Sequence, residues 1–100
     1  MKYYFHPSAK IELREAVSYY ETCGTNLGAE FAKEIYSTIQ LITKFPKAWT
    51  QMTKNTKRCI SKRFPYGVIY QIENRHILII AIMQLNRKPN YWKHRILKNK

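Results

Sequence analysis

The feature that most constrains the fold is a change in the spacing of apolar residues partway along the chain. Between residues 9 and 42, apolar side chains recur every three or four positions, which is the spacing of amphipathic helices. From residue 58 the pattern takes the period of two that is typical of strands, and residues 76–85 are apolar on both faces. A helical first half followed by a strand-forming second half predicts an α+β domain.

The breaker residues divide this pattern into elements. Residues 2–6 (KYYFH) predict a first strand that stops at Pro7, and Pro7 and Ser8 suit the first turn of a helix that ends at Gly24. Thr25 or Asn26 can cap a second helix, which must end before Pro46. The stripes expected to be buried are Ala9, Leu13, Ala16, Val17 and Tyr20 on the first helix, and Leu27, Phe31, Ile35, Ile39 and Ile42 on the second.

Residues 46–56 show neither period and are interpreted as a connecting loop. Strands are then expected at residues 58–64, 68–73 and 76–85, with a tight hairpin turn at Asn74-Arg75 although the favoured Gly is lacking. The tail 90–98, after Pro89, is expected to form a short helix or a strand-like arm. The expected order is β-α-α-β-β-β, a helical hairpin packed on a small, mainly antiparallel sheet, and residues 1–100 form a single domain.

The distribution of charge is strongly asymmetric. The chain has 18 Lys and Arg against six acidic residues, for a net charge of +12. Residues 1–34 hold four basic and five acidic side chains, whereas residues 35–100 hold fourteen basic side chains and only Glu73 as an acid. Such a field attracts polyanions, so nucleic acid, an acidic protein and an anionic membrane surface are the candidate partners.

Other signals are weak. Cys23 and Cys59 are far apart and are expected to be two buried, reduced thiols. The histidines are scattered, so no metal or cofactor is expected. Glu12 and Glu15 are interpreted as charges on a helix face, not as an acid/base pair. Because there is no signal-peptide core and no apolar run long enough to span a bilayer, a cytoplasmic location is expected.

Three segments carry a family resemblance: FHPSAKIELREAVSYYE, RCISKRFPYGVIYQIE and LNRKPNYWKHRI. With this element order and length, the chain resembles the RelE/ParE superfamily of toxins from type II toxin–antitoxin systems, and it looks more like the ParE-like branch. Many members are plasmid- or chromosome-borne stability modules. The resemblance implies an acidic antitoxin as partner in a hetero-oligomeric complex, which agrees with the basic surface.

The two branches imply different chemistry. RelE-like members cleave ribosome-bound mRNA without a metal, and Lys, Arg and Tyr side chains carry the reaction. The candidates for such a site are Arg58, Lys62, Arg63, Tyr66, Tyr70, Arg87, Lys88 and Tyr91. ParE-like members poison DNA gyrase by binding it, which needs an exposed basic and aromatic surface instead of a catalytic set. The residues expected for target binding are Arg87, Lys88, Tyr91, Trp92, Lys93 and Arg95.

One position favours the second branch. RelE-like enzymes commonly carry an Arg just after the middle turn, where this chain has Gly67, and glycine offers neither charge nor a proton relay. The sequence therefore predicts a gyrase-directed toxin that is not an enzyme. The alternatives are a metal-independent endoribonuclease and a non-toxic basic binding module. Neutralising Arg87, Lys88 and Arg95 together is expected to weaken toxicity and leave the fold intact, while Trp92 has the competing role of anchoring the tail.

Overall fold

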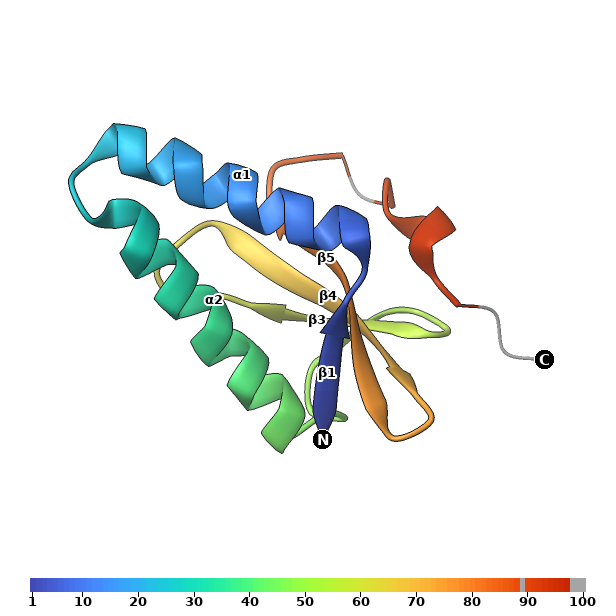
Figure 1. The fold of residues 1–100 in the computed structure, drawn as a ribbon. Coiled ribbons are helices and arrows are strands. Elements are labelled where there is room, and N and C mark those ends of the chain that lie inside the picture. Colours follow the sequence, from blue (N-terminus) through green and yellow to red (C-terminus); the bar gives the residue numbers. More distant parts are fainter. Residues whose placement is uncertain (89, 98–100) are drawn as a thin grey trace.

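A computed structural model of the chain describes residues 1–88 and 90–97. Its elements are β1 (Lys2–Phe5), α1 (Pro7–Cys23), α2 (Leu27–Lys44), β2 (Thr50–Thr53), β3 (Thr56–Ile60), β4 (Tyr66–Glu73), β5 (His76–Gln84) and the 3₁₀ turn η1 (Lys93–Arg95). The predicted α+β fold is confirmed (Figure 1). No helix in these residues is long and apolar enough to cross a membrane.

The sheet has five strands in the order β1-β5-β4-β3-β2. β1 runs parallel to β5, and the other neighbours are antiparallel, so the sheet is mainly antiparallel as predicted. The hairpin turn at Asn74-Arg75 is also confirmed, because both residues adopt positive φ angles of 46° and 67°, as a tight hairpin turn requires. Asparagine tolerates that conformation without a glycine.

The interpretation of residues 46–56 as a loop is wrong. Thr50–Thr53 form the edge strand β2, which pairs with Thr56–Arg58 of β3. This strand is polar and has no buried apolar face, so its side chains carry no period of two. The following strand also ends earlier than predicted, at Ile60, because the backbone N–H groups of Lys62 and Arg63 turn away to donate to Glu34 Oε2.

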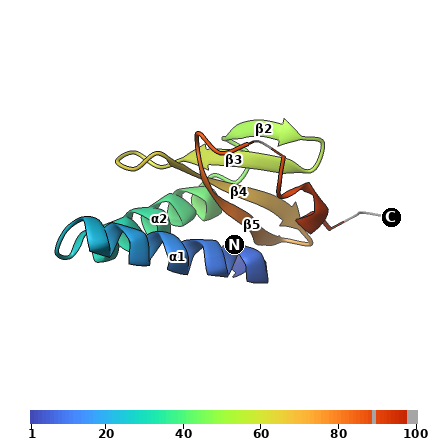
Figure 2. The same cartoon turned by 90° about the horizontal axis from the view of Figure 1, so that it is seen from above.

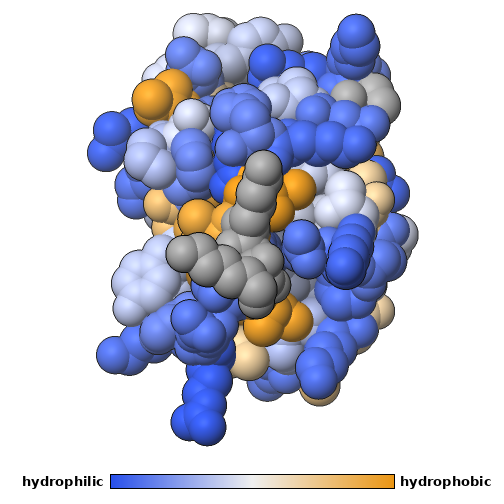
Figure 3. Space-filling model, turned by 90° about the vertical axis from the view of Figure 1, so that its right-hand side faces the viewer, coloured by the Kyte–Doolittle hydropathy of each residue, from blue (hydrophilic) through white to orange (hydrophobic). Residues whose placement is uncertain are grey.

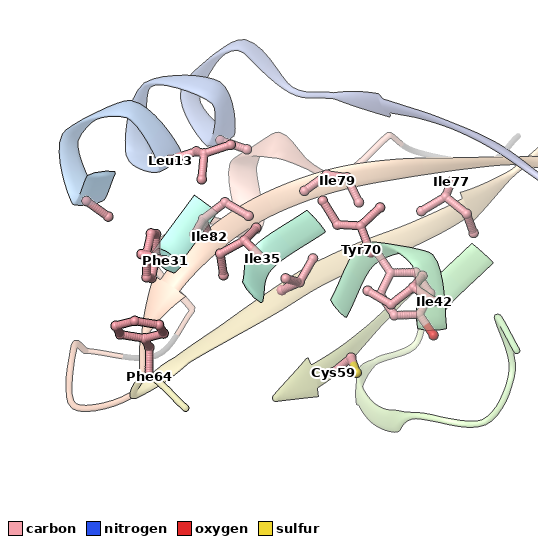
Figure 4. Close-up of a cluster of buried hydrophobic side chains, with 14 residues drawn as sticks. Leu13, Phe31, Ile35, Ile42, Cys59, Phe64, Tyr70, Ile77, Ile79 and Ile82 are labelled. Atoms are coloured by element: carbon pink, nitrogen blue, oxygen red, sulfur yellow. The ribbon is translucent and has the colours of Figure 1, made fainter. Parts of the chain in front are cut away.

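The helices cover one face of the sheet and the C-terminal segment lies on the other (Figures 1 and 2). The predicted helical stripe is confirmed on α2, where Phe31, Ile35, Ile39 and Ile42 are fully buried. With Leu13 of α1 they pack against Ile77, Ile79 and Ile82 of β5 (Figure 4). The opposite face of the sheet buries Ile69, Ala81 and Met83 against Trp92, so β5 is covered on both sides, as its composition predicted.

The tail forms a short helical turn, the first of the two forms expected for it. Pro89 and Lys98 lie outside the described residues. Of the two cysteines expected to be buried, Cys59 is buried and Cys23 is exposed. Burial raises the pKa of the Cys59 thiol to about 11, so this thiol stays protonated at neutral pH.

The junction of the two helices depends on Glu21 and Gly28. Asn26 occupies the N-cap position of α2, one of the two predicted, but its side chain makes no capping hydrogen bond. The Glu21 carboxylate of α1 accepts from the backbone N–H groups of Asn26 and Gly28 instead, at 3.1 and 3.0 Å. A Cβ atom on Gly28 would lie 2.6 Å from the Val17 carbonyl oxygen, so only glycine lets the helices approach this closely.

We predict that Gly28→Ala lowers the free energy of unfolding by about 1–3 kcal/mol, because the backbone of α1 must move to admit the methyl group. Gly24→Ala is the matched control, since its Cβ would meet Leu27 only at 3.8 Å. That variant should leave stability unchanged or raise it by up to about 1 kcal/mol. Urea denaturation followed by circular dichroism measures both, and equal effects would show that the helix contact is not tight at Gly28.

Candidate functional site

The segment after β5 carries the residues predicted to bind a target, and the structure divides them into buried and exposed members. We call residues 85–88 and 90–97 the C-terminal arm. Trp92 is fully buried against Ile69, Ile80 and Met83 on the outer face of the sheet. The expectation that Trp92 is part of an exposed surface is therefore wrong, and its anchoring role is confirmed: the indole holds the arm onto the sheet.

Arg95 is also buried, because it belongs to an ion pair with Glu12 of α1. Arg95 Nη1 and Nη2 donate to Glu12 Oε1 and Oε2 at 2.9 and 3.2 Å. The side chains are only 8% and 11% exposed. This is a bidentate, charge-assisted ion pair, the strongest arrangement available to a guanidinium and a carboxylate.

The same pair completes the hydrogen bonding of β5. β1 pairs with β5 only as far as Ile79, so the edge of β5 beyond that point has no neighbouring strand. There Glu12 Oε1 accepts from the Ile82 N–H at 3.0 Å, and Arg95 Nη1 donates to the Ile80 carbonyl at 3.1 Å. The interpretation of Glu12 as a helix-face charge is therefore wrong. No local signal could have revealed its role, because its partners are distant in the sequence.

Arg87, Lys88 and Lys93 are the exposed cations of the arm. The Arg87 guanidinium lies 3.9 Å from the centre of the Tyr91 ring and 3.7 Å from Glu12 Oε2, yet its side chain is 55% exposed. Tyr91 is half-buried beneath it. Burial, with the Glu12 carboxylate nearby, raises the pKa of Tyr91, so this phenol keeps its proton at neutral pH. The right-hand side of the molecule in Figure 1 is mostly hydrophilic, with small apolar patches (Figure 3).

The residues proposed for RNA cleavage do not meet in one place. Lys62 and Arg63 follow β3, where their backbone binds Glu34, and Arg63 Nη1 also lies 2.7 Å from Glu30 Oε1. Tyr70 points into the core beneath the helices, and its hydroxyl donates to the Pro46 carbonyl. Lys88 is exposed on the arm.

Tyr66 and Arg87 line one pocket, and Arg87 also contacts the Tyr91 ring. This pocket has a volume of about 180 Å³ and is also lined by Glu12 and Glu15. Two carboxylates beside the cation oppose the binding of a phosphate. Burial raises the pKa of Tyr66, so its phenol also stays protonated at neutral pH.

Arg58 lies elsewhere, on the outer face of the sheet. Arg58 is on β3, where it pairs with Ile69 of β4. Two residues later, Ile60 pairs with Gly67. A Cβ atom built on Gly67 would come within 3.1 Å of the Arg58 side chain. The space that a larger residue would fill at position 67 is therefore occupied by Arg58 from the neighbouring strand.

In the described residues, no group of His, Cys, Asp or Glu side chains is arranged to hold a metal ion. Among the Arg, Lys and Tyr candidates, Tyr66, Arg87 and Tyr91 lie close together beside Glu12, whereas Lys62, Arg63 and Tyr70 lie elsewhere.

Comparison with known proteins gives a consistent result. A family model described as the ParE toxin of the type II toxin–antitoxin system parDE matches residues 3–89. A solved structure described as a chromosomal ParDE toxin–antitoxin system from P. aeruginosa is similar to the chain, with a TM-score of 0.76 and 12% sequence identity. The match covers 86% of this chain and 97% of that one, and at this identity it shows a shared fold. No curated protein matches the chain.

We predict that Arg95→Met lowers the free energy of unfolding by roughly 3 kcal/mol, because the Glu12 carboxylate would remain buried without its main partner. Arg87→Met is the matched control, since Arg87 approaches the same carboxylate from an exposed position, and it should cost less than about 1 kcal/mol. Thermal and urea unfolding of both variants measure the difference. A loss for Arg87→Met as large as that for Arg95→Met would contradict the assignment of Arg95 as the structural partner.

Proposed function

Because the chain belongs to the ParE toxin family of type II toxin–antitoxin systems, we propose that it stops growth by poisoning DNA gyrase and that an acidic antitoxin neutralises it. The match of the family model to residues 3–89 is the observation that carries this proposal. The family membership makes the chain a toxin of a type II system. We propose DNA gyrase as its target and an acidic protein as its antitoxin.

The distribution of side chains supports a toxin that acts by binding. A nuclease needs a base, a charge-stabilising cation and a proton donor around one phosphate. Here Tyr66 and Arg87 share their pocket with two carboxylates, and Arg58 lies on the outer face of the sheet. Binding to a protein requires no such assembly. The exposed cations Arg87, Lys88 and Lys93 on an arm anchored by Trp92 provide a surface of the necessary kind.

An acidic antitoxin follows from the charge of the chain. Residues 35–100 hold one carboxylate, at Glu73, among fourteen basic side chains. The solved structure that resembles this chain is described as a toxin–antitoxin system, which agrees with a protein partner. A flexible acidic segment that folds on binding would gain electrostatic steering and would bind less tightly as salt is raised.

Messenger RNA cleavage is the second candidate, and one observation favours it. The Arg58 side chain fills the space beside Gly67, so a guanidinium is present near the position where RelE-like enzymes carry an arginine. This arrangement would be a rearranged nuclease site on the outer face of the sheet. The experiment below separates it from gyrase poisoning.

We predict that the purified chain abolishes supercoiling by DNA gyrase and causes cleaved DNA to accumulate, while mRNA in a translation extract stays intact. Changing Arg87, Lys88 and Lys93 together to Gln should raise the concentration needed for half-inhibition about tenfold or more, corresponding to at least about 1.4 kcal/mol of binding free energy. Arg95 is left unchanged because its loss would disturb the fold.

The control variant changes Lys2, Lys33 and Lys44, which are exposed and lie outside the arm, to Gln and so removes the same charge. It should inhibit gyrase like the unmodified chain. Codon-positioned cuts in mRNA with unchanged supercoiling would reject the gyrase proposal in favour of the nuclease. Equal losses in the two triple variants would show that the arm is not the working surface.

A further inference from the structure

A second basic site, which uses none of the arm's cations, lies on the side of the sheet near the end of α2 and reaches the end of the arm at Gln71, whose side chain exchanges hydrogen bonds with the Leu97 backbone. It is a pocket of about 310 Å³ between the loop after α2, the β2–β3 hairpin and β4. Its lining includes Lys47, Lys54, Lys57, Gln51, Asn55 and Tyr70. Lys47, Gln51, Lys54 and Asn55 belong to the segment 46–56, which carries no apolar period, and neither the proposed gyrase surface nor the candidate nuclease site uses the pocket's lysines.

Hydrogen bonds hold the pocket's framework in place. Gln51 Oε1 accepts from Lys57 Nζ at 2.9 Å, while Gln51 Nε2 donates to the carbonyl groups of Thr53 and Lys54. The Tyr70 hydroxyl donates to the Pro46 carbonyl and so fixes the loop that carries Lys47 to the centre of the sheet. These hydrogen bonds therefore hold in place the backbone segments that carry the three lysines.

The charge of the pocket is not balanced within the described residues. The ion pairs among the described residues are made by Glu12 and Glu30, and none of them includes Lys47, Lys54 or Lys57. No carboxylate lines the pocket. Three ammonium groups around one cavity repel each other, and an anion placed among them would remove that repulsion. An ammonium has three N–H donors, so Lys57 retains two after its bond to Gln51.

The chemistry of the donors favours a phosphate group. A carboxylate is planar and is best matched by the fork of an arginine, whereas lysines act as separate point charges that suit an anion with oxygens pointing in several directions. Lys47 and Lys54 are exposed at the rim, which would let a chain of phosphates continue beyond the pocket. An extended polyanion fits this shape better than an isolated small ion.

We propose that this pocket, which we call the lysine pocket, holds a backbone phosphate of duplex DNA. The choice of DNA rests on the proposed function, since gyrase holds a DNA duplex while it works. In that setting the arm contacts the enzyme, and the lysine pocket contacts the DNA beside it. The contact is to the backbone and reads no base sequence.

The test measures the affinity of the isolated chain for a fluorescently labelled DNA duplex by anisotropy, between about 50 and 200 mM salt. Each lysine that neutralises a phosphate contributes about 0.9 to the slope of log affinity against log salt. Changing Lys47, Lys54 and Lys57 together to Gln should therefore reduce that slope by roughly two to three. The control that changes Lys2, Arg14 and Lys33, which are exposed and do not line the pocket, to Gln removes equal charge and should reduce the slope by less than about one.

Equal slopes in the two variants would overturn the proposal, because the binding would then follow net charge alone. A second measurement does not depend on the variants folding. Titrating the unmodified chain with inorganic phosphate should shift the NMR amide signals of residues 47, 54, 55 and 57, and no shift there would overturn the site. If polyglutamate loses affinity for the lysine-pocket variant as DNA does and inorganic phosphate shifts no signal, the pocket is an acidic-protein interface instead.

These results are independent of the gyrase assay. A reduced slope for the lysine-pocket variant, together with a chain that leaves gyrase active, would support the phosphate site and reject the proposed function. Conversely, gyrase inhibition by the unmodified chain, with DNA binding by the variant unchanged, would reject only the phosphate site.

Discussion

The Glu12 carboxylate is the point at which the helices, the sheet and the C-terminal arm are joined. β1 is too short to cover the whole edge of β5, so the groups of Ile80 and Ile82 at that edge need partners other than a strand. Glu12 from α1 and Arg95 from the arm supply them. A buried peptide group without a partner is costly, so the Glu12–Arg95 pair stabilises β5 by completing its hydrogen bonds.

This arrangement explains how a small domain covers both faces of its sheet. β5 is apolar on both sides, and only one side is covered by helices. Trp92 covers part of the other side, and Arg95 fastens the segment that carries it. The arm is thus part of the fold at its buried residues, while Arg87, Lys88 and Lys93 remain exposed. Within this one short segment, some residues stabilise the fold and others are available for the proposed binding to a target.

The basic charge is likewise divided between surfaces. On the arm, the exposed Arg87 lies 3.7 Å from the Glu12 carboxylate, whereas the lysine pocket has no carboxylate in its lining. Cations next to a carboxylate are partly neutralised, and those in the lysine pocket are not. The proposed target, gyrase bound to DNA, would offer a protein partner for the arm and a nucleic-acid partner for the lysine pocket.

The sequence by itself determined the two helices, the strands β1, β3, β4 and β5 and the α+β class, because residue periods and breaker residues are local properties of each segment. It also identified the family through the residues around the middle hairpin. It did not reveal β2, since a polar edge strand has no apolar alternation. The tertiary structure alone decided that Arg95 and Trp92 are buried, that Glu12 is central, and that Lys47, Lys54 and Lys57 meet. The sequence states the charge of each side chain, but the exposure of that side chain depends on its partners in the fold. Glu12 and Arg95, which shield each other from solvent, are 83 positions apart in the sequence.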